Sequence, residues 1–574
     1  MLISIIINYN HLKGIFDMPK YTIGIDYGTQ SGRAVMVDVQ TGEVVAQNVK
    51  MYAHGVMDRE LPDGTPLPLD WALEHPADYI DVLETVIPAV VKESCVDPED
   101  IIGIGVDVTS NTFMPMDKDC MPLCLNPEFE KNPHAWLKLW KHHGGQSQAN
   151  RMTKIALERG EPFIKRYGNK INSEWMWPKL AEIAEAAPEI YEATDCFMEA
   201  GDWLVYLLTG EKTRSESVAG YKLNWIKGEG YPSSEYLKAV HPSLEHAVEE
   251  KLGGKLLSIG QCAGRLTEEM AEKLGLKAGI AVATALIDAH VATPALGIDG
   301  PGKMLLVIGT SCGVILCSET GDEIPGICGV VEDGVLPGYF GYEAGQSCVG
   351  DMFEWFVKNC VPENYEKEAR ERGMNIHQLL AEKANKLKIG ESGLIALDWW
   401  NGNRSCLTDA ELNGLLLGMT LSTKPEEIYR ALIESAAYGI RAIIDMFEEN
   451  KVPISELYAC GGISKKNAMM MRIYADVTGR EIFIGASDQS PALGSAMFGA
   501  AAAGAAAGGY DSVIEAAGVM GRVEEKSYKP VPENVAVYEK LYQEFKLLHD
   551  YFGRGGNDVM KRLRKIKAEQ SAKR

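Results

Sequence analysis

The sequence has no long hydrophobic run and few basic residues for its length. The apolar run near its start, residues 2–7, is far too short to cross a bilayer, and no basic segment or cleavage site of a signal peptide accompanies it. Lys and Arg number 57 against 80 Asp and Glu, which gives a net charge of −23. Sequence-independent binding of nucleic acid needs a basic surface. We therefore expect neither a membrane nor a nucleic acid as a partner.

Metal-binding cysteine motifs and two common kinase motifs are also missing. The 12 cysteines form no C-x-x-C pair and no cluster with histidine at zinc spacing. They are typical of reduced thiols, and we expect a cytoplasmic protein. No G-x-x-x-x-G-K-[ST] segment occurs, which excludes a P-loop kinase, and no protein-kinase set of H-R-D and D-F-G occurs.

The chain of 574 residues is long enough for two large domains or for three to four smaller ones. Met18 stands just before the first predicted strand. We interpret residues 1–19 as a disordered N-terminal extension.

The segment YTIGIDYGTQSGRAVMVDV, residues 21–39, predicts a strand, a tight polar turn and a second strand. Gly28 allows the backbone to come close to a ligand, and the turn can direct N–H groups and the hydroxyls of Thr29 and Ser31 toward a phosphate. Asp26, at the end of the first strand, can hold Mg²⁺ directly or through water. Taken alone, this turn fits an ordinary hairpin equally well.

A second turn of the same type lies in MLLVIGTSCGVIL, residues 304–316, where Gly309, Thr310 and Ser311 separate two apolar strands. Paired phosphate turns suggest two related halves that close on one nucleotide. Further on, residues 457–484 predict a strand, the pair Gly461–Gly462, a helix and another strand, which suits a surface that receives adenosine.

Asp288 is the leading catalytic candidate, because it ends an apolar strand within residues 281–294. A helix N-cap is the alternative interpretation. Glu343 lies between glycines, so a sugar could approach it closely, although a plain turn explains it equally well. For Lys222 the simplest interpretation is a surface lysine. Residues 134–150 predict a helix followed by a glycine break, in which Trp140 is more easily explained by core packing than by a site.

Several segments together resemble the FGGY family of sugar kinases. They are IGIDYGTQSGR, IGTSCG and ACGGISKKN, which occur in the order of that family, and GLLLGMTLSTKPEEIYRALIE, which is similar to its signature except at Leu432. The segments GVDVTSNTFMP, NPHAWLKLWKHH, CGVVEDGVLPGYFGYEAGQS and LDWWNGNRS resemble the branch that phosphorylates ribulose. The resemblance covers roughly residues 20–552.

The resemblance implies an α/β protein of two ribonuclease H-like (actin-like ATPase) domains with the active site in the cleft between them. The domains would span residues 20–294, with the sugar site and the first phosphate turn, and 295–574, with the nucleotide site and a helical C-terminal tail. Asp288 matches the catalytic base. The sugar contacts would be Ser110, Lys222, Asp288 and Glu343. The nucleotide contacts would be Gly28, Thr29, Ser31, Gly309, Thr310, Ser311, Gly461, Gly462 and Asn467. Mg²⁺ would lie near Asp26 and Asp288.

The implied reaction is ATP-dependent phosphorylation of L-ribulose to its 5-phosphate, as in the catabolism of L-arabinose, with ATP and Mg²⁺ bound and a homodimer possible. Kinases of D-ribulose, xylulose or ribitol are alternatives within the family. A non-kinase actin-like ATPase is the alternative outside it, and it would have no sugar site.

Overall fold

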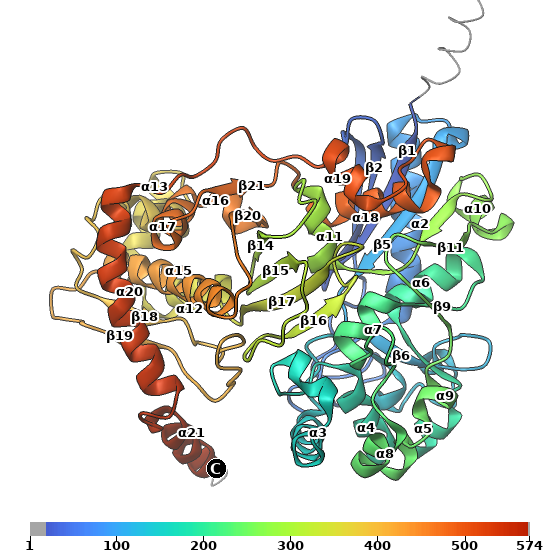
Figure 1. Cartoon of the computed structure of the whole chain (residues 1–574), viewed down its shortest axis with the longest axis horizontal. Coiled ribbons are helices and arrows are strands. Elements are labelled where there is room, and N and C mark those ends of the chain that lie inside the picture. The colour runs from blue at the N-terminus through green and yellow to red at the C-terminus, as the bar shows by residue number, and fades with distance from the viewer. Residues whose placement is uncertain (1–18, 572–574) are drawn as a thin grey trace, which may run out of the picture.

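The computed structural model describes residues 19–571. The predicted disordered extension, residues 1–19, lies outside the described residues apart from Pro19. Two mixed sheets form the centre of the molecule. In Figure 1 the N-terminal half, blue to green, lies beside most of the C-terminal half, yellow-green to red, although residues 490–520 of the latter lie among the blue strands. None of the helices within residues 19–571 is long and apolar enough to cross a membrane.

The N-terminal sheet has the order β11-β12-β5-β1-β2-β3, and β13 also pairs with β5. Its strands are β1 (Tyr21–Tyr27), β2 (Ser31–Asp38), β3 (Val44–Met51), β5 (Ile101–Val108), β11 (Cys262–Arg265), β12 (Ala281–Ala283) and β13 (Leu286–Ile287). β1, β2 and β3 are antiparallel, while β5 runs parallel to β1 with Asp107 opposite Asp26. The strand–turn–strand prediction for residues 21–39 is confirmed.

The C-terminal sheet repeats this pattern in the order β16-β17-β15-β14-β20-β21. Its strands are β14 (Lys303–Ile308), β15 (Cys312–Ser318), β16 (Gly329–Glu332), β17 (Phe340–Gln346), β20 (Glu456–Cys460) and β21 (Ile482–Ile484). β14, β15 and β17 are antiparallel neighbours, and β20 runs parallel to β14. Each half therefore has a three-stranded meander followed by parallel strands, as the paired turns suggest.

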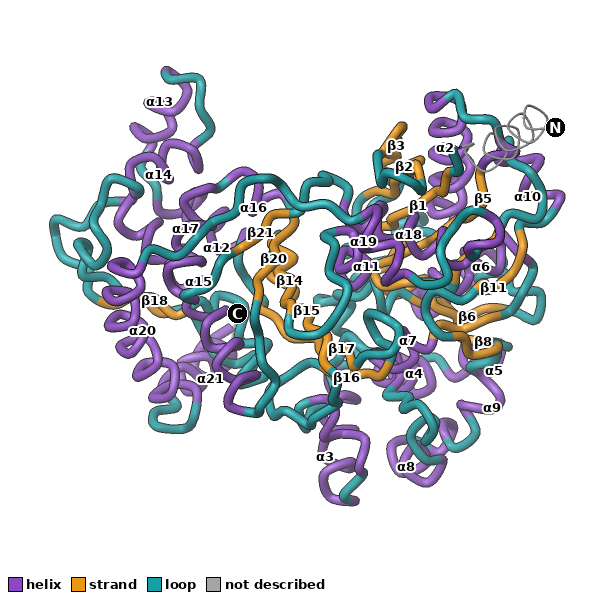
Figure 2. The backbone as a smooth tube through the Cα atoms, turned by 45° about the horizontal axis from the view of Figure 1, so that its top comes forward, coloured by secondary structure: helices purple, strands orange, loops and turns teal. Residues whose placement is uncertain are grey.

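The helices α11 (Asp288–Ala295) and α18 (Ser490–Ala503) lie between the two sheets (Figure 2). α18 packs directly on β1 and β5 because these strands carry glycines: a Cβ at Gly105 would lie 1.9 Å from the carbonyl oxygen of Ser495. The alanine- and glycine-rich helix that the sequence predicts is thus present. Since this helix of the C-terminal half lies on the N-terminal sheet, the division at residues 294 and 295 stays a prediction.

On its other side, the N-terminal sheet is covered by α2 (Pro76–Ser94), α6 (Ala200–Thr209) and α10 (Glu268–Leu274). A four-stranded sheet extends this half, made of β4 (Leu73–Glu74), β7 (Leu137–Lys138), β6 (Phe113–Met116) and β8 (Cys196–Glu199). Around it are α3 (Gln146–Arg159), α4 (Met176–Ala186), α5 (Pro188–Ala193), α8 (Ser234–Val240) and α9 (Ala247–Lys251). The short elements β9 (Thr213–Ser215), α7 (Glu216–Leu223) and β10 (Lys255–Leu257) lie nearby.

The prediction of a helix from residue 134 is wrong. Residues 133–135 form a single 3₁₀ turn, and β7 follows at Leu137. Lys138 pairs with both Leu73 and Phe113 in the small sheet, so strand pairing takes the backbone groups that a helix would need. The helix α3 starts only after Gly145.

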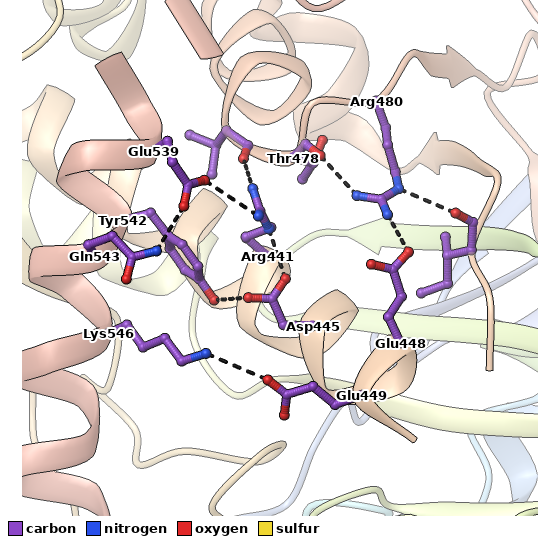
Figure 3. A network of polar contacts seen from close by, with 12 residues as sticks. Arg441, Asp445, Glu448, Glu449, Thr478, Arg480, Glu539, Tyr542, Gln543 and Lys546 are labelled. Atoms are coloured by element: carbon purple, nitrogen blue, oxygen red, sulfur yellow. Dashed lines mark hydrogen bonds and ion pairs between the residues drawn. The ribbon is translucent and has the colours of Figure 1, made fainter. Parts of the chain in front are cut away.

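The C-terminal half also contains α12 (Gly350–Cys360), α13 (Glu363–Glu371), α14 (Ile376–Ala384), α15 (Pro425–Glu449), α16 (Gly462–Lys466), α17 (Ala468–Thr478), α20 (Pro532–Gly553) and α21 (Val559–Ser571). The helix α19 (Val513–Met520) packs on α18 and α11 instead. The small sheet of β18 (Ile395–Leu397) and β19 (Leu415–Leu417) lies beside α15. Polar contacts fasten α20 to α15, where Asp445 accepts a hydrogen bond from Tyr542 at 2.7 Å and pairs with Arg441 at 2.8 Å (Figure 3).

Candidate active site

A cavity of about 240 Å³ lies where the two halves meet. Its walls combine the ends of β5 and β13, the start of α11, and the hairpin of β14 and β15. Among the predicted site residues, those that line it are Ser110, Lys222, Asp288, Gly309, Thr310, Ser311 and Glu343. The structure thus brings together the catalytic candidate, the sugar contacts and the second phosphate turn.

Asp288 is the first residue of α11, directly after β13. The N-cap position belongs to Ile287, so the alternative of a capping aspartate is wrong. The N–H of Ala289 donates to Oδ1 of Asp288 at 2.7 Å. Burial and then the negative charge of Asp26 raise the pKa of Asp288 to about 7, and Lys222 opposes this rise. A carboxylate with such a pKa can take up a proton near neutral pH.

Lys222, on α7, and Glu343, in the middle of β17, form an ion pair across the two halves at 2.9 Å. The Lys222 side chain is only 6% exposed, so the interpretation as a surface lysine is wrong. Glu343 lies in a strand rather than in a plain turn. Burial alone would raise the pKa of Glu343, but Lys222 and then His290 lower it to about 2. The Glu343 carboxylate is therefore charged at neutral pH.

Each of the two predicted phosphate turns is closed by a hydrogen bond from the N–H of its glycine to the carbonyl of its serine. The N–H of Gly28 donates to the carbonyl of Ser31 at 3.0 Å, and that of Gly309 donates to the carbonyl of Ser311 at 2.9 Å. The Thr29 hydroxyl accepts from the indole N–H of Trp140 at 3.1 Å, and the Ser31 hydroxyl accepts from Arg33 at 3.1 Å. The turn of Gly28, Thr29 and Ser31 does not itself line the cavity. Because both hydroxyl oxygens act as acceptors here, the O–H groups of Thr29 and Ser31 can still donate hydrogen bonds to a ligand.

The segment after β20 also lies outside the cavity walls. Gly461 precedes α16 with a φ of 95°, and a Cβ there would lie 2.4 Å from the carbonyl of Ile308 at the end of β14. A Cβ at Gly462 would meet nothing within 4 Å. The side-chain oxygen of Asn467 accepts from the N–H of Met470 and caps α17, which leaves its amide N–H groups free to donate. The adenosine contact of these residues stays a prediction.

Three carboxyl groups gather at the strand ends of the N-terminal sheet: the buried Asp26 and Asp107, and the half-buried Asp288. Asp26 lies 3.6 Å from Nε of Arg33, and Ser495 donates to Asp107 at 2.5 Å. Burial and then the charge of Asp26 raise the pKa of Asp107 well above its usual range. Within residues 19–571 no group of three or more His, Cys, Asp or Glu could hold a metal by itself. Mg²⁺ commonly takes one or two carboxylates and completes its shell with phosphates and water, so these oxygens fit it.

Several cavity residues were not predicted as site residues, namely Thr109, Asn111, Trp140, Glu174, His290 and Arg404. For Trp140 the sequence favoured core packing, whereas the structure places it between the cavity and the first phosphate turn. Glu174 and Arg404 face each other from opposite halves at 3.5 Å. Arg404 lies in the segment LDWWNGNRS, which carries part of the resemblance, whereas no quoted segment contains Glu174. Only the tertiary structure brings these two residues together.

Comparisons with known proteins agree with this arrangement. The N-terminal domain of the FGGY family of carbohydrate kinases matches residues 21–295, and its C-terminal domain matches residues 304–503. Ribulokinase from Bacillus licheniformis is 58% identical over 94% of this chain and 98% of its own length. Ribulokinase from Halalkalibacterium halodurans is 56% identical over 96% of this chain and 98% of its own.

Solved structures agree on the fold. Xylulose kinase from Rhodospirillum rubrum superposes with a TM-score of 0.76 at 22% identity, over 92% of this chain and 98% of that one. Glycerol kinase from Plasmodium falciparum with ADP superposes with a TM-score of 0.70 at 15% identity, over 93% and 98%. The predicted fold of two actin-like domains is confirmed.

Proposed function

Because the chain belongs to the FGGY family of carbohydrate kinases, we propose that it transfers the γ-phosphoryl group of ATP to the terminal hydroxyl of L-ribulose. Ribulokinases match it over nearly their whole length. The observation that carries the proposal further is the convergence of Asp288 and the pair of Lys222 and Glu343 on one cavity beside a phosphate turn. A kinase with a polar substrate needs this combination of a base, hydroxyl-binding groups and phosphate donors.

Asp288 acts as the general base. Its carboxylate accepts the proton of the sugar's terminal hydroxyl while that oxygen attacks the γ-phosphorus. A pKa of about 7 suits this step, because the group is both substantially ionised and sufficiently basic near neutral pH. The N–H of Ala289 holds the carboxylate oxygen in place through its hydrogen bond.

The turn of Gly309, Thr310 and Ser311 binds phosphate oxygens through its N–H and hydroxyl groups. The turn of Gly28, Thr29 and Ser31 serves the same purpose from the other half when the halves close, which excludes water from the reacting phosphate. Gly461, Gly462 and Asn467 contact the adenosine. Asp26 and Asp288 hold Mg²⁺, which supplies neutralisation of the charge on the ATP phosphates.

Lys222 and Glu343 bind hydroxyl groups of the sugar, the first as a donor and the second as an acceptor, and Ser110 contacts it at the end of β5. A site that hydrogen-bonds several hydroxyls rejects sugars that leave its buried groups unpaired. Glycerol is too short to reach both Lys222 and Asp288, so we expect it to be a poor substrate. D-ribulose, xylulose and ribitol each keep several of the contacts and are the nearest alternatives.

A coupled assay of ADP release tests the proposal. We expect kcat/KM to be highest for L-ribulose in a panel with D-ribulose, both xyluloses, ribitol and glycerol at fixed ATP and Mg²⁺. A preference for D-xylulose or glycerol over both ribuloses would contradict the substrate but not the kinase class. ATP hydrolysis that no sugar stimulates would instead favour the alternative of a non-kinase actin-like ATPase.

A further inference from the structure

Besides Asp288, four charged side chains line the cavity, and each half of the molecule supplies one cation and one anion of these four. Lys222 and Glu174 belong to the N-terminal half, and Glu343 and Arg404 to the C-terminal half. Lys222 pairs with Glu343 at 2.9 Å, and Arg404 faces Glu174 at 3.5 Å. The proposed function uses the first pair, whereas the second has no assigned role.

Arg404 is held in place next to Glu343. The hydroxyl of Ser405 accepts a hydrogen bond at 2.9 Å from the N–H of Gly345, which lies on β17 two residues after Glu343. A Cβ at Gly345 would lie 3.6 Å from Cδ of Arg404, so the side chain runs along this strand. The N–H of Cys406 donates to the carbonyl of Gly326 at 3.1 Å and fixes the loop on its other side.

The contact between Arg404 and Glu174 is longer than a close ion pair. One guanidinium nitrogen, Nη2, lies 3.5 Å from both carboxylate oxygens, whereas charge-assisted hydrogen bonds are usually about 2.7–2.9 Å long. The side chains are 24% and 15% exposed and face the cavity. A hydroxyl group can accept a hydrogen bond from such a guanidinium and donate one to the carboxylate.

The cavity that contains Asp288 also contains both of these pairs. Gly345, against which Arg404 packs, pairs with Gly313 beside the turn of β14 and β15, whereas Glu343 pairs with Ile315, two residues further along the strand. A ketopentose whose terminal hydroxyl meets Asp288 has further hydroxyl groups that need partners in the same cavity.

We propose that Glu174 and Arg404 form a clasp that binds a hydroxyl group of the ketopentose other than the one that Asp288 deprotonates. The inference rests on the proposed function, because it takes the sugar and the role of Asp288 from it. Arg404 donates a hydrogen bond to the oxygen of that hydroxyl, and Glu174 accepts one from it. Because each half supplies one partner, a bound ketopentose joins the two halves.

Steady-state kinetics of Arg404→Met and Glu174→Gln test the clasp, with the ketopentose that the wild type uses best. We expect each variant to raise KM for the sugar about 10- to 100-fold, as for the loss of a hydrogen bond to a charged group, and to change KM for ATP less than about twofold. A set of deoxy analogues of the same sugar, each lacking one hydroxyl other than the terminal one, identifies the group that the clasp binds. We expect one analogue to be a much poorer substrate of the wild type than the parent sugar, whereas Arg404→Met should discriminate little between these two.

Lys170→Met is the matched control. Lys170 also joins the halves near this loop, since its amine donates to the carbonyl of Thr408 at 2.6 Å, but it does not line the cavity. We expect its KM for the sugar to stay within about twofold of the wild type. An equal rise in Lys170→Met would show that the effect comes from holding the halves together, and would overturn the clasp.

The remaining outcomes separate the two proposals. The clasp is overturned, and the proposed function left intact, if neither clasp variant changes KM for the sugar. The same holds if Arg404→Met discriminates against every deoxy analogue as strongly as the wild type does. Failure of the wild type to phosphorylate any ketopentose overturns both. If Arg404→Met does not fold, Glu174→Gln carries the test, because it keeps the shape of the side chain.

Discussion

Replacing Asp288 by Asn should remove turnover and at the same time stabilise the protein at alkaline pH. The pKa of the Asp288 carboxyl is raised from 3.8 to about 7, mainly by burial and then by Asp26. Between pH 3.8 and about 7 the Asp288 carboxyl therefore stays protonated in the folded protein, whereas it is ionised in the unfolded chain. The stability linked to this proton is fully present below pH 3.8 and is lost as the pH rises through 7. Asn carries no charge at any pH and avoids that loss.

The two pKa values differ by about 3, and each unit of difference is worth about 1.36 kcal/mol. Above pH 7 the ionised carboxyl therefore lowers the free energy of unfolding of the wild type by at most about 4 kcal/mol. Water in the cavity solvates part of the carboxylate, so we expect about 1–3 kcal/mol. Asn also retains an oxygen that can accept from the N–H of Ala289. Removal of the base should lower kcat about 10²- to 10⁴-fold.

Urea unfolding of Asp288→Asn and the wild type between pH 5.5 and 8.5 measures the first effect. We expect the midpoint of the variant to exceed that of the wild type by an amount that grows with pH and levels off above 7. Asp58→Asn, at an exposed aspartate, is the control and should show no such trend. The reasoning is refuted if Asp288→Asn is equally or less stable at pH 8.5, or if it retains turnover near that of the wild type.

Three further changes test the site and the fold. Thr310→Val should raise KM for ATP or lower kcat about 10-fold or more, because a hydroxyl bonded to a charged phosphate is worth about 1.5–3 kcal/mol. KM for the sugar should stay nearly constant. Unchanged ATP kinetics would contradict the placement of Thr310 at the phosphates. Lys222→Met should raise KM for the sugar and leave KM for ATP nearly unchanged. The pH midpoint of kcat/KM should rise, because Lys222 lowers the pKa of Asp288. A midpoint that falls would count against Asp288 as the titrating base. Gly105→Ala should destabilise the protein by about 1–3 kcal/mol or more, since the added Cβ would lie 1.9 Å from the carbonyl of Ser495. Gly518→Ala, where a Cβ meets nothing within 4 Å, is its control in thermal unfolding and should be neutral or slightly stabilising.

Much of the fold was predictable because its signals are local. The strand-forming, largely apolar residues predicted β1 and β2, and the matching turn at Gly309 predicted that the second half would repeat the first. Asp288 was recognisable because a carboxylate directly after an apolar strand lies at the edge of a sheet, where ligands bind. The helix predicted from residue 134 failed because its pattern of apolar residues serves strand pairing in the small sheet instead.

The sequence by itself therefore determined the strands of the two hairpins, the glycine-containing turns between them and the choice of Asp288 as catalytic candidate, since each depends on neighbouring residues. The tertiary structure alone decided that Lys222 is a buried partner of Glu343 rather than a surface lysine, and that Glu174 faces Arg404 across the cavity. It also set the pKa of Asp288, because burial and the charge of Asp26 act through space and not along the chain. Contacts between residues hundreds of positions apart leave no mark in local periodicity, so folding had to bring them together before they could be recognised.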